Sequence, residues 1–358
     1  MSNWPDHRIV DLLGIQLPIL QAPMAGATGS AMAIAVARAG GLGALPCAML
    51  SGEQLRDEIA TFRSACPGLP LNLNFFCHQP PSPDSDRDNR WKQALKPYYA
   101  EVGADFEAPT PVSNRAPFDE ASCQLVEQLR PEVVSFHFGL PEAALLQRVK
   151  AAGAKVLSSA TTVEEALWLQ DHGCDAIIAM GYEAGGHRGM FLSEDITSQI
   201  GTFALVPQIA DAVRLPVIAA GGIADHRGLV AALALGASAV QIGTAYLFCP
   251  EAKVSAAHRR ALDNAAASDT ALTNVFTGRP ARGINNRIMR ELGPMSDLAP
   301  RFPLAGGALM PLRAITDPKG NSDFSNLWSG QALRLGKAMP AEQLTREIAA
   351  KALALIAH

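Results

Sequence analysis

The chain has 358 residues, of which 48% are hydrophobic and 18% are charged, and its formal net charge is −4. This length and composition can fill a large core, and the slight acidity excludes the basic face that nucleic-acid binding needs. The six cysteines are scattered without a C-x-x-C pair. Their spacing favours reduced thiols in a cytoplasmic protein and argues against a disulfide framework or a metal site.

Strands and helices are expected to alternate eight times along the first 246 residues. The expected strands are continuous apolar runs, which are typical of parallel sheets covered on both faces. They are residues 17–26, 42–49, 71–76, 133–138, 155–159, 176–180, 216–220 and 239–246. The expected helices are residues 30–39, 51–65, 142–152, 162–172, 202–213 and 225–235. The count and the length predict a closed (β/α)8 TIM barrel over residues 1–248. A doubly wound open sheet is the alternative, but the first strand–helix turn lacks its G-x-G-x-x-G fingerprint.

Two regions interrupt or follow the alternation. Residues 79–117 form an insert after the third strand that is too long for an ordinary connection, so we expect a lid or side wall. Tyr98 and Tyr99 in this insert either close over the site or form an exposed patch. Residues 249–358 are expected to be a helical appendage that packs on the barrel and reaches its mouth. Its expected helices are residues 252–267, 327–339 and 342–357.

No membrane segment or signal peptide is expected. Residues 1–11 are polar and mixed in charge. Residues 229–249 carry no charge and are long enough to span a bilayer. Small residues make this stretch weakly hydrophobic, and the Gly-Ala-Ser at 236–238 divides it, so a helix followed by a buried strand is expected.

Glycines follow the seventh and eighth strands. Gly221 and Gly222 end the seventh strand and lead into a helix, and the eighth strand carries the run Gln241-Ile242-Gly243-Thr244. Phosphate groups are commonly held at these two positions of a barrel, where bare backbone amides and a helix N-terminus face the ligand. The pair therefore indicates a bound phosphate ester, although glycines also serve simply to close tight turns.

The remaining strand ends carry polar groups suited to a planar ligand and to proton transfer. The first strand ends in an uncharged segment with Pro23 and Met24, which can lie flat against a ring. Asn74 is an amide inside an apolar strand, with Asn72 as a competing candidate. After the sixth strand, glycines bracket His187 and Arg188, a proton carrier beside a fixed cation.

His187 is therefore the candidate catalytic residue, as a general base or as a hydrogen-bond donor to an anionic substrate. His137 ends the fourth strand, where it either supports the site or simply lies at the barrel mouth.

With these motifs in place, residues 21–247 resemble the nitronate monooxygenase family. The resemblance rests on Q-A-P-M-A-G at 21–26, on Asn74, on E-A-G-G-H-R-G at 183–189, on A-G-G-I at 220–223 and on Q-I-G-T at 241–244. It implies a TIM barrel that holds FMN non-covalently. It also implies that alkyl nitronates, such as propionate 3-nitronate, are oxidised by O2 to a carbonyl compound and nitrite, which detoxifies them.

The resemblance also implies roles for individual residues. His187 matches the family's catalytic histidine. The implied FMN-binding residues are Pro23, Met24, Asn74, Met180, Gly185, Gly186, Gly221, Gly222, Gln241, Ile242, Gly243 and Thr244. Met180 stands where the family often has a glutamine that contacts the flavin, and a thioether cannot replace the amide donor.

Three other hypotheses remain open from the sequence. An FMN barrel of the same type could be an NAD(P)H-using enoyl-thioester reductase. A flavin-free barrel could bind a phosphorylated substrate, and a non-enzymatic protein could simply bind flavin. The expected partners are a small-molecule substrate and O2, without nucleic acid, membrane or metal, and a homo-oligomer is compatible with the sequence.

Overall fold

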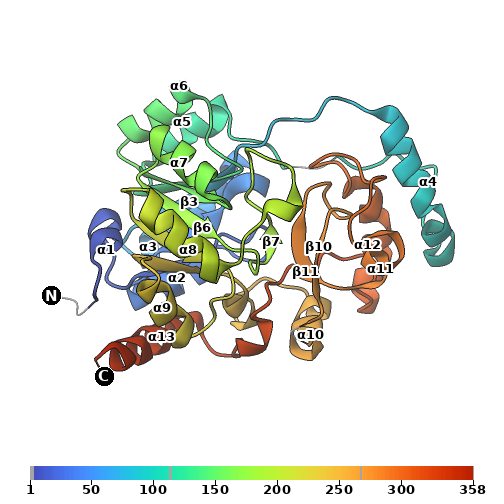
Figure 1. The fold of residues 1–358 in the computed structure, drawn as a ribbon. Helices are drawn as coiled ribbons and strands as arrows, with labels where there is room; N and C mark the ends of the chain where they lie inside the picture. The colour runs from blue at the N-terminus through green and yellow to red at the C-terminus, as the bar shows by residue number, and fades with distance from the viewer. Residues whose placement is uncertain (1–3, 113–114, 267, 358) are drawn as a thin grey trace.

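A computed structural model describes residues 4–112, 115–266 and 268–357 of the chain. Eight parallel strands form one sheet in the order β1-β9-β8-β6-β5-β4-β3-β2. A parallel bridge between Leu20 and Leu42 joins the two ends of the sheet, so the sheet closes on itself. The predicted (β/α)8 barrel is confirmed (Figure 1).

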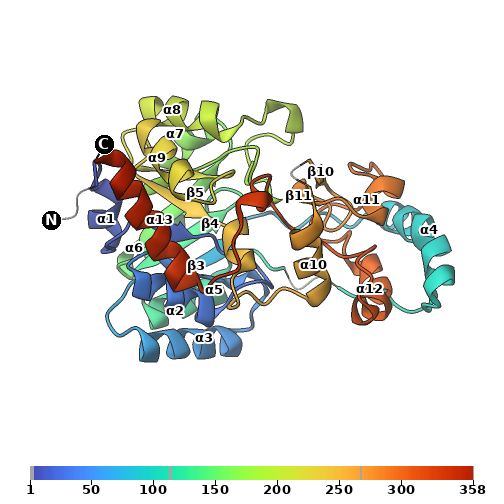
Figure 2. The ribbon, with the colours of Figure 1, turned by 90° about the horizontal axis from the view of Figure 1, so that it is seen from below.

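The barrel strands are β1 (Ile19–Gln21), β2 (Gly43–Pro46), β3 (Leu71–Phe76), β4 (Val133–His137), β5 (Lys155–Ala160), β6 (Ala176–Met180), β8 (Val217–Ala220) and β9 (Ala239–Ile242). The surrounding helices are α2 (Ser30–Ala39), α3 (Gly52–Ala65), α5 (Glu120–Leu129), α6 (Ala143–Ala151), α7 (Val163–Asp171), α8 (Thr202–Ala212), α9 (His226–Ala234) and α13 (Ala341–Ile356). The last of these, α13, packs on α2 and α9, so the end of the chain completes the helical ring (Figure 2).

The interior of the barrel is filled below the strand ends. Leu20, Leu42, Leu157, Ile178 and Ile218 form one buried cluster there. Helix α1 (Arg8–Leu13) contributes buried side chains to the same cluster. Because this layer is packed, a ligand can enter the barrel only from the carboxyl ends of the strands.

One buried side chain reinforces the seam between β1 and β2. Gln21 is fully buried, and its amide donates to the Ala44 carbonyl at 3.0 Å while its oxygen accepts from the Ala44 N–H, also at 3.0 Å. These two bonds continue the pairing beyond the backbone bonds between Gln21 and Leu42 and between Leu42 and Ile19. An amide does this well because it carries both a donor and an acceptor.

A second lobe lies beside the barrel, on the far side from both termini (Figure 1). It contains a three-stranded sheet in which the central strand β11 (Ala281–Ile284) pairs with β10 (Thr270–Thr273) on one side and with β7 (Gly186–His187), from the barrel loop, on the other. Its helices are α4 (Ser85–Val102), α10 (Ala256–Asn264), α11 (Arg287–Leu292) and α12 (Met310–Thr316). Sequence analysis did not foresee these strands, because none of them is a continuous apolar run.

The insert and the C-terminal segment share one core. Tyr98 and Tyr99 are buried in it, and their hydroxyls donate to Glu291 at 2.8 Å and to the Ala308 carbonyl at 2.6 Å. Both expectations for these tyrosines, a cover over the site and an exposed patch, are therefore wrong. The helix predicted over residues 327–339 is also wrong, since the structure has only the short 3-10 turn η6 (Leu333–Leu335) there.

The other short turns are η1 (Cys47–Met49), η2 (Ile196–Ser198), η3 (Thr244–Phe248), η4 (Gly307–Leu309) and η5 (Asp317–Lys319). Within the described ranges, no helix combines the length and the apolar character needed to cross a membrane.

Candidate active site

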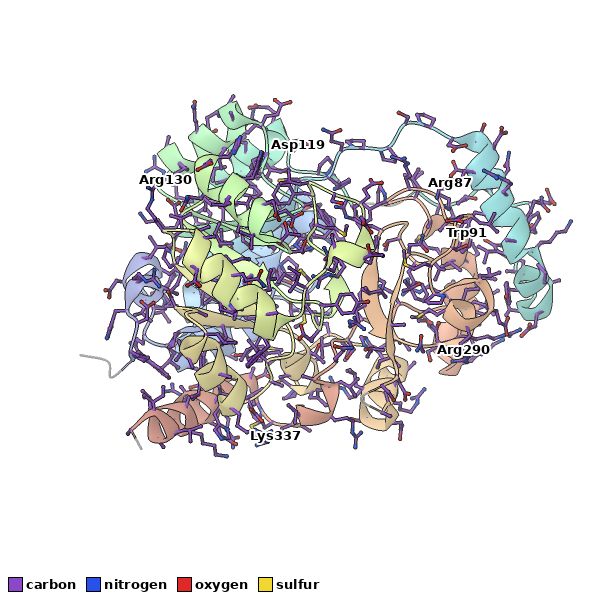
Figure 3. All side chains as sticks on the ribbon, in the orientation of Figure 1. Arg87, Trp91, Asp119, Arg130, Arg290 and Lys337 are labelled. Atoms are coloured by element: carbon purple, nitrogen blue, oxygen red, sulfur yellow. The ribbon has the colours of Figure 1, made fainter. Side chains whose placement is uncertain are left out.

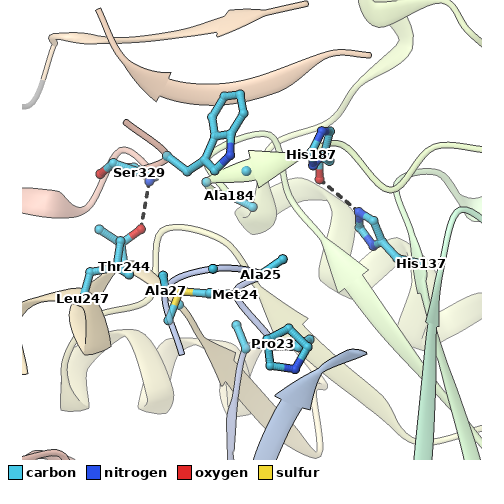
Figure 4. Close-up of a pocket in the computed structure, with 18 of the residues that line it drawn as sticks. Pro23, Met24, Ala25, Ala27, His137, Ala184, His187, Thr244, Leu247 and Ser329 are labelled. Carbon is cyan, nitrogen blue, oxygen red and sulfur yellow. Dashed lines mark hydrogen bonds between the residues drawn. The ribbon is translucent and has the colours of Figure 1, made fainter. Parts of the chain in front are cut away.

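A cavity of about 450 Å³ opens at the carboxyl ends of the barrel strands. Its volume lies within the range of small-molecule and cofactor sites. Figure 4 shows Thr244 and Leu247 on one side of the cavity and His137 and His187 on the other. The predicted site residues that line it are Pro23, Met24, Asn74, Met180, Gly185, Gly186, His187, Gly221, Gly222, Gln241, Gly243 and Thr244. Ile242 does not line it, because its side chain alternates outward into the core between strands and helices.

The glycine-rich ends of β8 and β9 present free donors to this cavity. Gly221 and Gly222 have φ angles of 108° and 71°, which L-residues rarely adopt. Within the described part of the chain, the backbone N–H groups of Gly222, Ile223 and Thr244 donate to no other protein group. Thr244 Oγ1 accepts from the Gly330 N–H at 2.8 Å, so its own hydroxyl hydrogen remains available. Such a cluster of donors at a helix N-terminus suits a phosphate.

Two amides face the middle of the cavity. Gln241 Oε1 is buried with no partner among the described residues, so it needs a donor from a ligand. Asn74 donates to Ser135 Oγ at 3.0 Å and to the Ser135 carbonyl at 3.2 Å, which fixes its amide at the cavity wall. Asn72 is on the same inward face but two residues deeper, and it does not reach the cavity. A flat ring with both N–H and carbonyl edges fits these groups.

His187 lies in the short strand β7 and is held by the second lobe. Its backbone pairs with Ala281 of β11, and its Nε2 lies 2.9 Å from Thr277 Oγ1. The rings of Phe302 and Trp328 have centroids 5.2 and 5.6 Å from the imidazole. Burial, and then the positive charge of Arg115, hold the pKa of His187 well below its ordinary value, so the ring is neutral at pH 7.

His137 supports the backbone of His187. Its Nε2 lies 3.1 Å from the His187 carbonyl oxygen, and its Nδ1 lies 2.7 Å from Ser159 Oγ. A carbonyl can only accept, so Nε2 carries the hydrogen and the Ser159 hydroxyl donates to Nδ1. Burial lowers the pKa of His137 to about 4, which keeps this neutral tautomer in place. His137 therefore lines the cavity and also fixes the loop that carries His187.

Arg188 does not act as a cation beside His187, contrary to the expectation from sequence. Neighbouring residues of an extended chain point to opposite sides, and Arg188 is fully buried behind the loop. Its guanidinium donates to the carbonyls of Gly181 at 2.6 Å and Met180 at 2.8 Å, and to Gln199 Oε1 at 2.8 Å. Burial lowers its pKa to about 10, so it stays charged and holds the end of β6.

Sequence analysis missed the part of the site that comes from the second lobe. We call residues 325–332 the capping segment; most of its residues line the cavity. Gly185 lies so close to it that a Cβ there would be 2.5 Å from the Gly330 nitrogen. Arg115 and Arg313 also line the cavity. These residues carry no local signature, because they reach the site only through folding of segments far apart in the chain, such as Gly330 and Thr244, which are 86 residues apart.

Among the described residues, no set of three or more histidine, cysteine, aspartate or glutamate side chains is placed to hold a metal ion.

The chain matches known proteins over nearly its whole length. The family model of nitronate monooxygenase matches residues 6–351. The nitronate monooxygenase of Pseudomonas aeruginosa is 43% identical over 345 residues, which cover 95% of this chain and 97% of that protein. The nitronate monooxygenase of Paraburkholderia phytofirmans is 40% identical over 343 residues, 95% of this chain and 93% of that protein.

Two solved structures are similar in fold. The nitroalkane oxidase of Streptomyces ansochromogenes superposes with a TM-score of 0.89 at 36% identity, covering 98% of this chain and 100% of that chain. FabK of Thermotoga maritima superposes with a TM-score of 0.74 at 27% identity, covering 98% and 97%. The barrel, the cavity with His187 and the full-length match lead to one conclusion: the chain belongs to the nitronate monooxygenase family, whose members are flavin-dependent oxidoreductases.

Proposed function

We propose that the chain holds FMN in this cavity and oxidises alkyl nitronates with O2 to a carbonyl compound and nitrite. The observation that carries the proposal is the cavity itself. It combines the free N–H groups of Gly222, Ile223 and Thr244 with a buried, partnerless Gln241 Oε1 beside His187. The N–H groups suit the FMN phosphate, and Gln241, Asn74 and the Pro23–Met24 segment suit the isoalloxazine ring.

The protein groups then position and neutralise the substrate. When bound, FMN supplies the electron-transfer chemistry between an electron-rich nitronate carbon and O2. The neutral His187 either donates a hydrogen bond to a nitronate oxygen or accepts a proton from a neutral nitroalkane. Arg115, whose charge lowers the pKa of His187, adds positive potential that attracts an anion to the same place.

The second lobe favours a substrate with a further negative group. Arg313 lines the cavity and lies close enough to Arg115 that its charge lowers the pKa of Arg115. The carboxylate of Asp317 lies 3.6 Å from the Arg313 guanidinium. A nitronate with a carboxylate, such as propionate 3-nitronate, would be attracted by the two guanidinium groups at this wall of the cavity, and its oxidation would detoxify it.

An absorbance spectrum followed by oxygen uptake tests the main proposal. We expect a yellow protein with a flavin spectrum that releases FMN on denaturation. We also expect it to consume O2 and form nitrite when a nitronate is added without a nicotinamide. A colourless preparation that neither binds added FMN nor consumes O2 would refute the proposal.

The substrate's charge is tested by comparing two nitronates. Arg313→Ala should raise KM for propionate 3-nitronate about 10- to 100-fold, the effect of losing a charged hydrogen bond of about 1.5–3 kcal/mol, and should leave ethylnitronate unchanged. Arg290→Ala is a matched control, because Arg290 is exposed on α11 and does not line the cavity (Figure 3). Equal effects on both nitronates would contradict a carboxylate site at Arg313.

An NAD(P)H-dependent enoyl-thioester reductase is the second candidate, because FabK shares the barrel at 27% identity. Mixing the flavoprotein with NADPH without oxygen separates the two. Slow or absent bleaching supports the monooxygenase, and rapid bleaching without nitronate turnover supports the reductase. A cytoplasmic location also belongs to the proposal, and the six unpaired cysteines support it.

A further inference from the structure

The His187 ring has one polar partner within the described part of the chain, the Thr277 hydroxyl, at 2.9 Å from Nε2. Thr277 follows β10 in the second lobe, 90 residues along the chain from His187. It is 1% exposed and does not line the cavity. The aromatic side chains around the ring pack against the imidazole but cannot choose between its two nitrogens. Four charged or titratable groups, Arg115, His137, Arg279 and His78, also lie near enough that, after burial, they lower the pKa of His187.

We propose that Thr277 is a positioning residue that holds Nε2 of His187 and so leaves Nδ1 as the nitrogen that meets the substrate. The ring lines the cavity, whereas Nε2 is engaged by a buried hydroxyl outside it. This inference rests on the proposed function of His187, but it concerns an orientation that can be measured without turnover.

The hydroxyl can support both forms of the neutral ring. Thr277 Oγ1 also lies 3.4 Å from the Arg279 carbonyl, which can only accept. When the hydroxyl donates to that carbonyl, its oxygen accepts from Nε2–H, and Nδ1 is a free base for a neutral nitroalkane. When the hydroxyl instead donates to Nε2, Nδ1 carries the hydrogen and can donate to a nitronate anion.

The local fold keeps this hydroxyl in place. The turn after β10 is closed by the Gly278 N–H, which donates to the Asn274 carbonyl at 2.7 Å, and Arg188 N–H donates to the Pro280 carbonyl at 2.9 Å. The second bond ties the histidine loop to the strand that follows Thr277. Both partners of the hydrogen bond are therefore fixed by backbone contacts, and a rotation of Thr277 alone would break it.

Two substitutions at Thr277 separate hydrogen bonding from packing. Thr277→Val keeps the shape and removes the hydroxyl, and Thr277→Ser keeps the hydroxyl and removes a methyl group. We expect Thr277→Val to retain flavin and lower kcat by at least about 10-fold and up to about 10²-fold, the loss that misplacing a reacting group produces. Thr277→Ser should stay within a few-fold of the parent.

The pH profile and a spectroscopic readout complete the test. Loss of the acceptor for a protonated Nε2 should shift the acid limb of kcat/KM to lower pH in Thr277→Val only. In holoprotein labelled with 15N-histidine, the His187 ring signals, assigned with His187→Asn, should change in Thr277→Val and be restored in Thr277→Ser. Parent-like signals and rates in Thr277→Val would overturn the proposal, and so would equal losses in both variants. If the signals change but neither the parent nor the variants oxidise nitronates, the proposed function fails while the positioning role stands.

Discussion

Replacing Gly185 with alanine should detach the capping segment from the barrel mouth. An alanine Cβ at this position would lie 2.5 Å from the Gly330 nitrogen and 2.6 Å from the Ser329 carbonyl carbon. Both atoms belong to the backbone, so no side chain can rotate to make room. The φ angle of Gly185 is not positive, and alanine itself is therefore unstrained there. The collision with the capping segment is the whole effect.

The magnitude follows from what must move. Forcing an extra methyl group into a packed contact costs about 1–3 kcal/mol. Displacing the segment also breaks two hydrogen bonds, from the Gly330 N–H to Thr244 Oγ1 at 2.8 Å and from the Gln331 N–H to the Glu183 carbonyl at 3.0 Å. Each is worth about 0.5–1.5 kcal/mol. The free energy that holds the capping segment against the barrel mouth, relative to its locally opened state, should therefore fall by about 2–6 kcal/mol.

Hydrogen exchange measured by mass spectrometry tests this directly. In the parent, the N–H groups of Ser329, Gly330 and Gln331 are all hydrogen-bonded and should exchange slowly. In Gly185→Ala they should exchange at least about tenfold faster, because 1.4 kcal/mol is a factor of ten. Flavin should also bind more weakly, since this segment lines the cavity.

A neighbouring glycine provides the control. Gly186 has a φ of 72° and nothing within 4 Å of its Cβ position, so Gly186→Ala costs only backbone strain of about 1–2 kcal/mol. It should leave exchange in the capping segment unchanged. If Gly185→Ala exchanged like the parent in this segment, or if both variants accelerated it equally, the steric argument would be wrong.

Further expectations concern catalysis, folding and pH. His187→Asn should keep flavin but lose about 10²- to 10⁴-fold in turnover of ethylnitronate, and a parent-like rate would remove His187 from the chemistry. Arg188→Met should lower the free energy of unfolding in urea by about 1–3 kcal/mol for each acceptor left unsatisfied, chiefly the Met180 carbonyl and Gln199 Oε1, since the Gly181 carbonyl still accepts from the Ala184 N–H; a loss below about 1 kcal/mol would contradict this role. Burial lowers the pKa values of His78, His137 and His258 from 6.5 to about 4 in the folded state, so the unfolded chain binds more protons between these values. The free energy of unfolding should be highest above about pH 6.5 and fall towards pH 4. Thermal unfolding at pH 7.5, 6 and 5 measures this, and a Tm that stays flat or rises as the pH is lowered would contradict the expectation.

The sequence alone determined the barrel and which of its ends carries the candidate site. Continuous apolar runs separated by helical segments leave few arrangements besides a parallel sheet covered on both faces. Parallel strands must then present all their carboxyl ends at one edge, so glycines and polar residues that follow the strands meet there. For this reason the sequence alone predicts that Asn74, His187, Gly222 and Thr244 lie together, and all four line the cavity.

Only the tertiary structure decided what closes the site. Arg188 looked like a catalytic cation but points behind the loop, since side-chain direction depends on β7 pairing with β11 far along the chain. Thr277 and the capping segment reach His187 through the second lobe, whose short strands carry no periodic signal. Local sequence fixes which residues end a strand, whereas long-range packing fixes which distant residues face them.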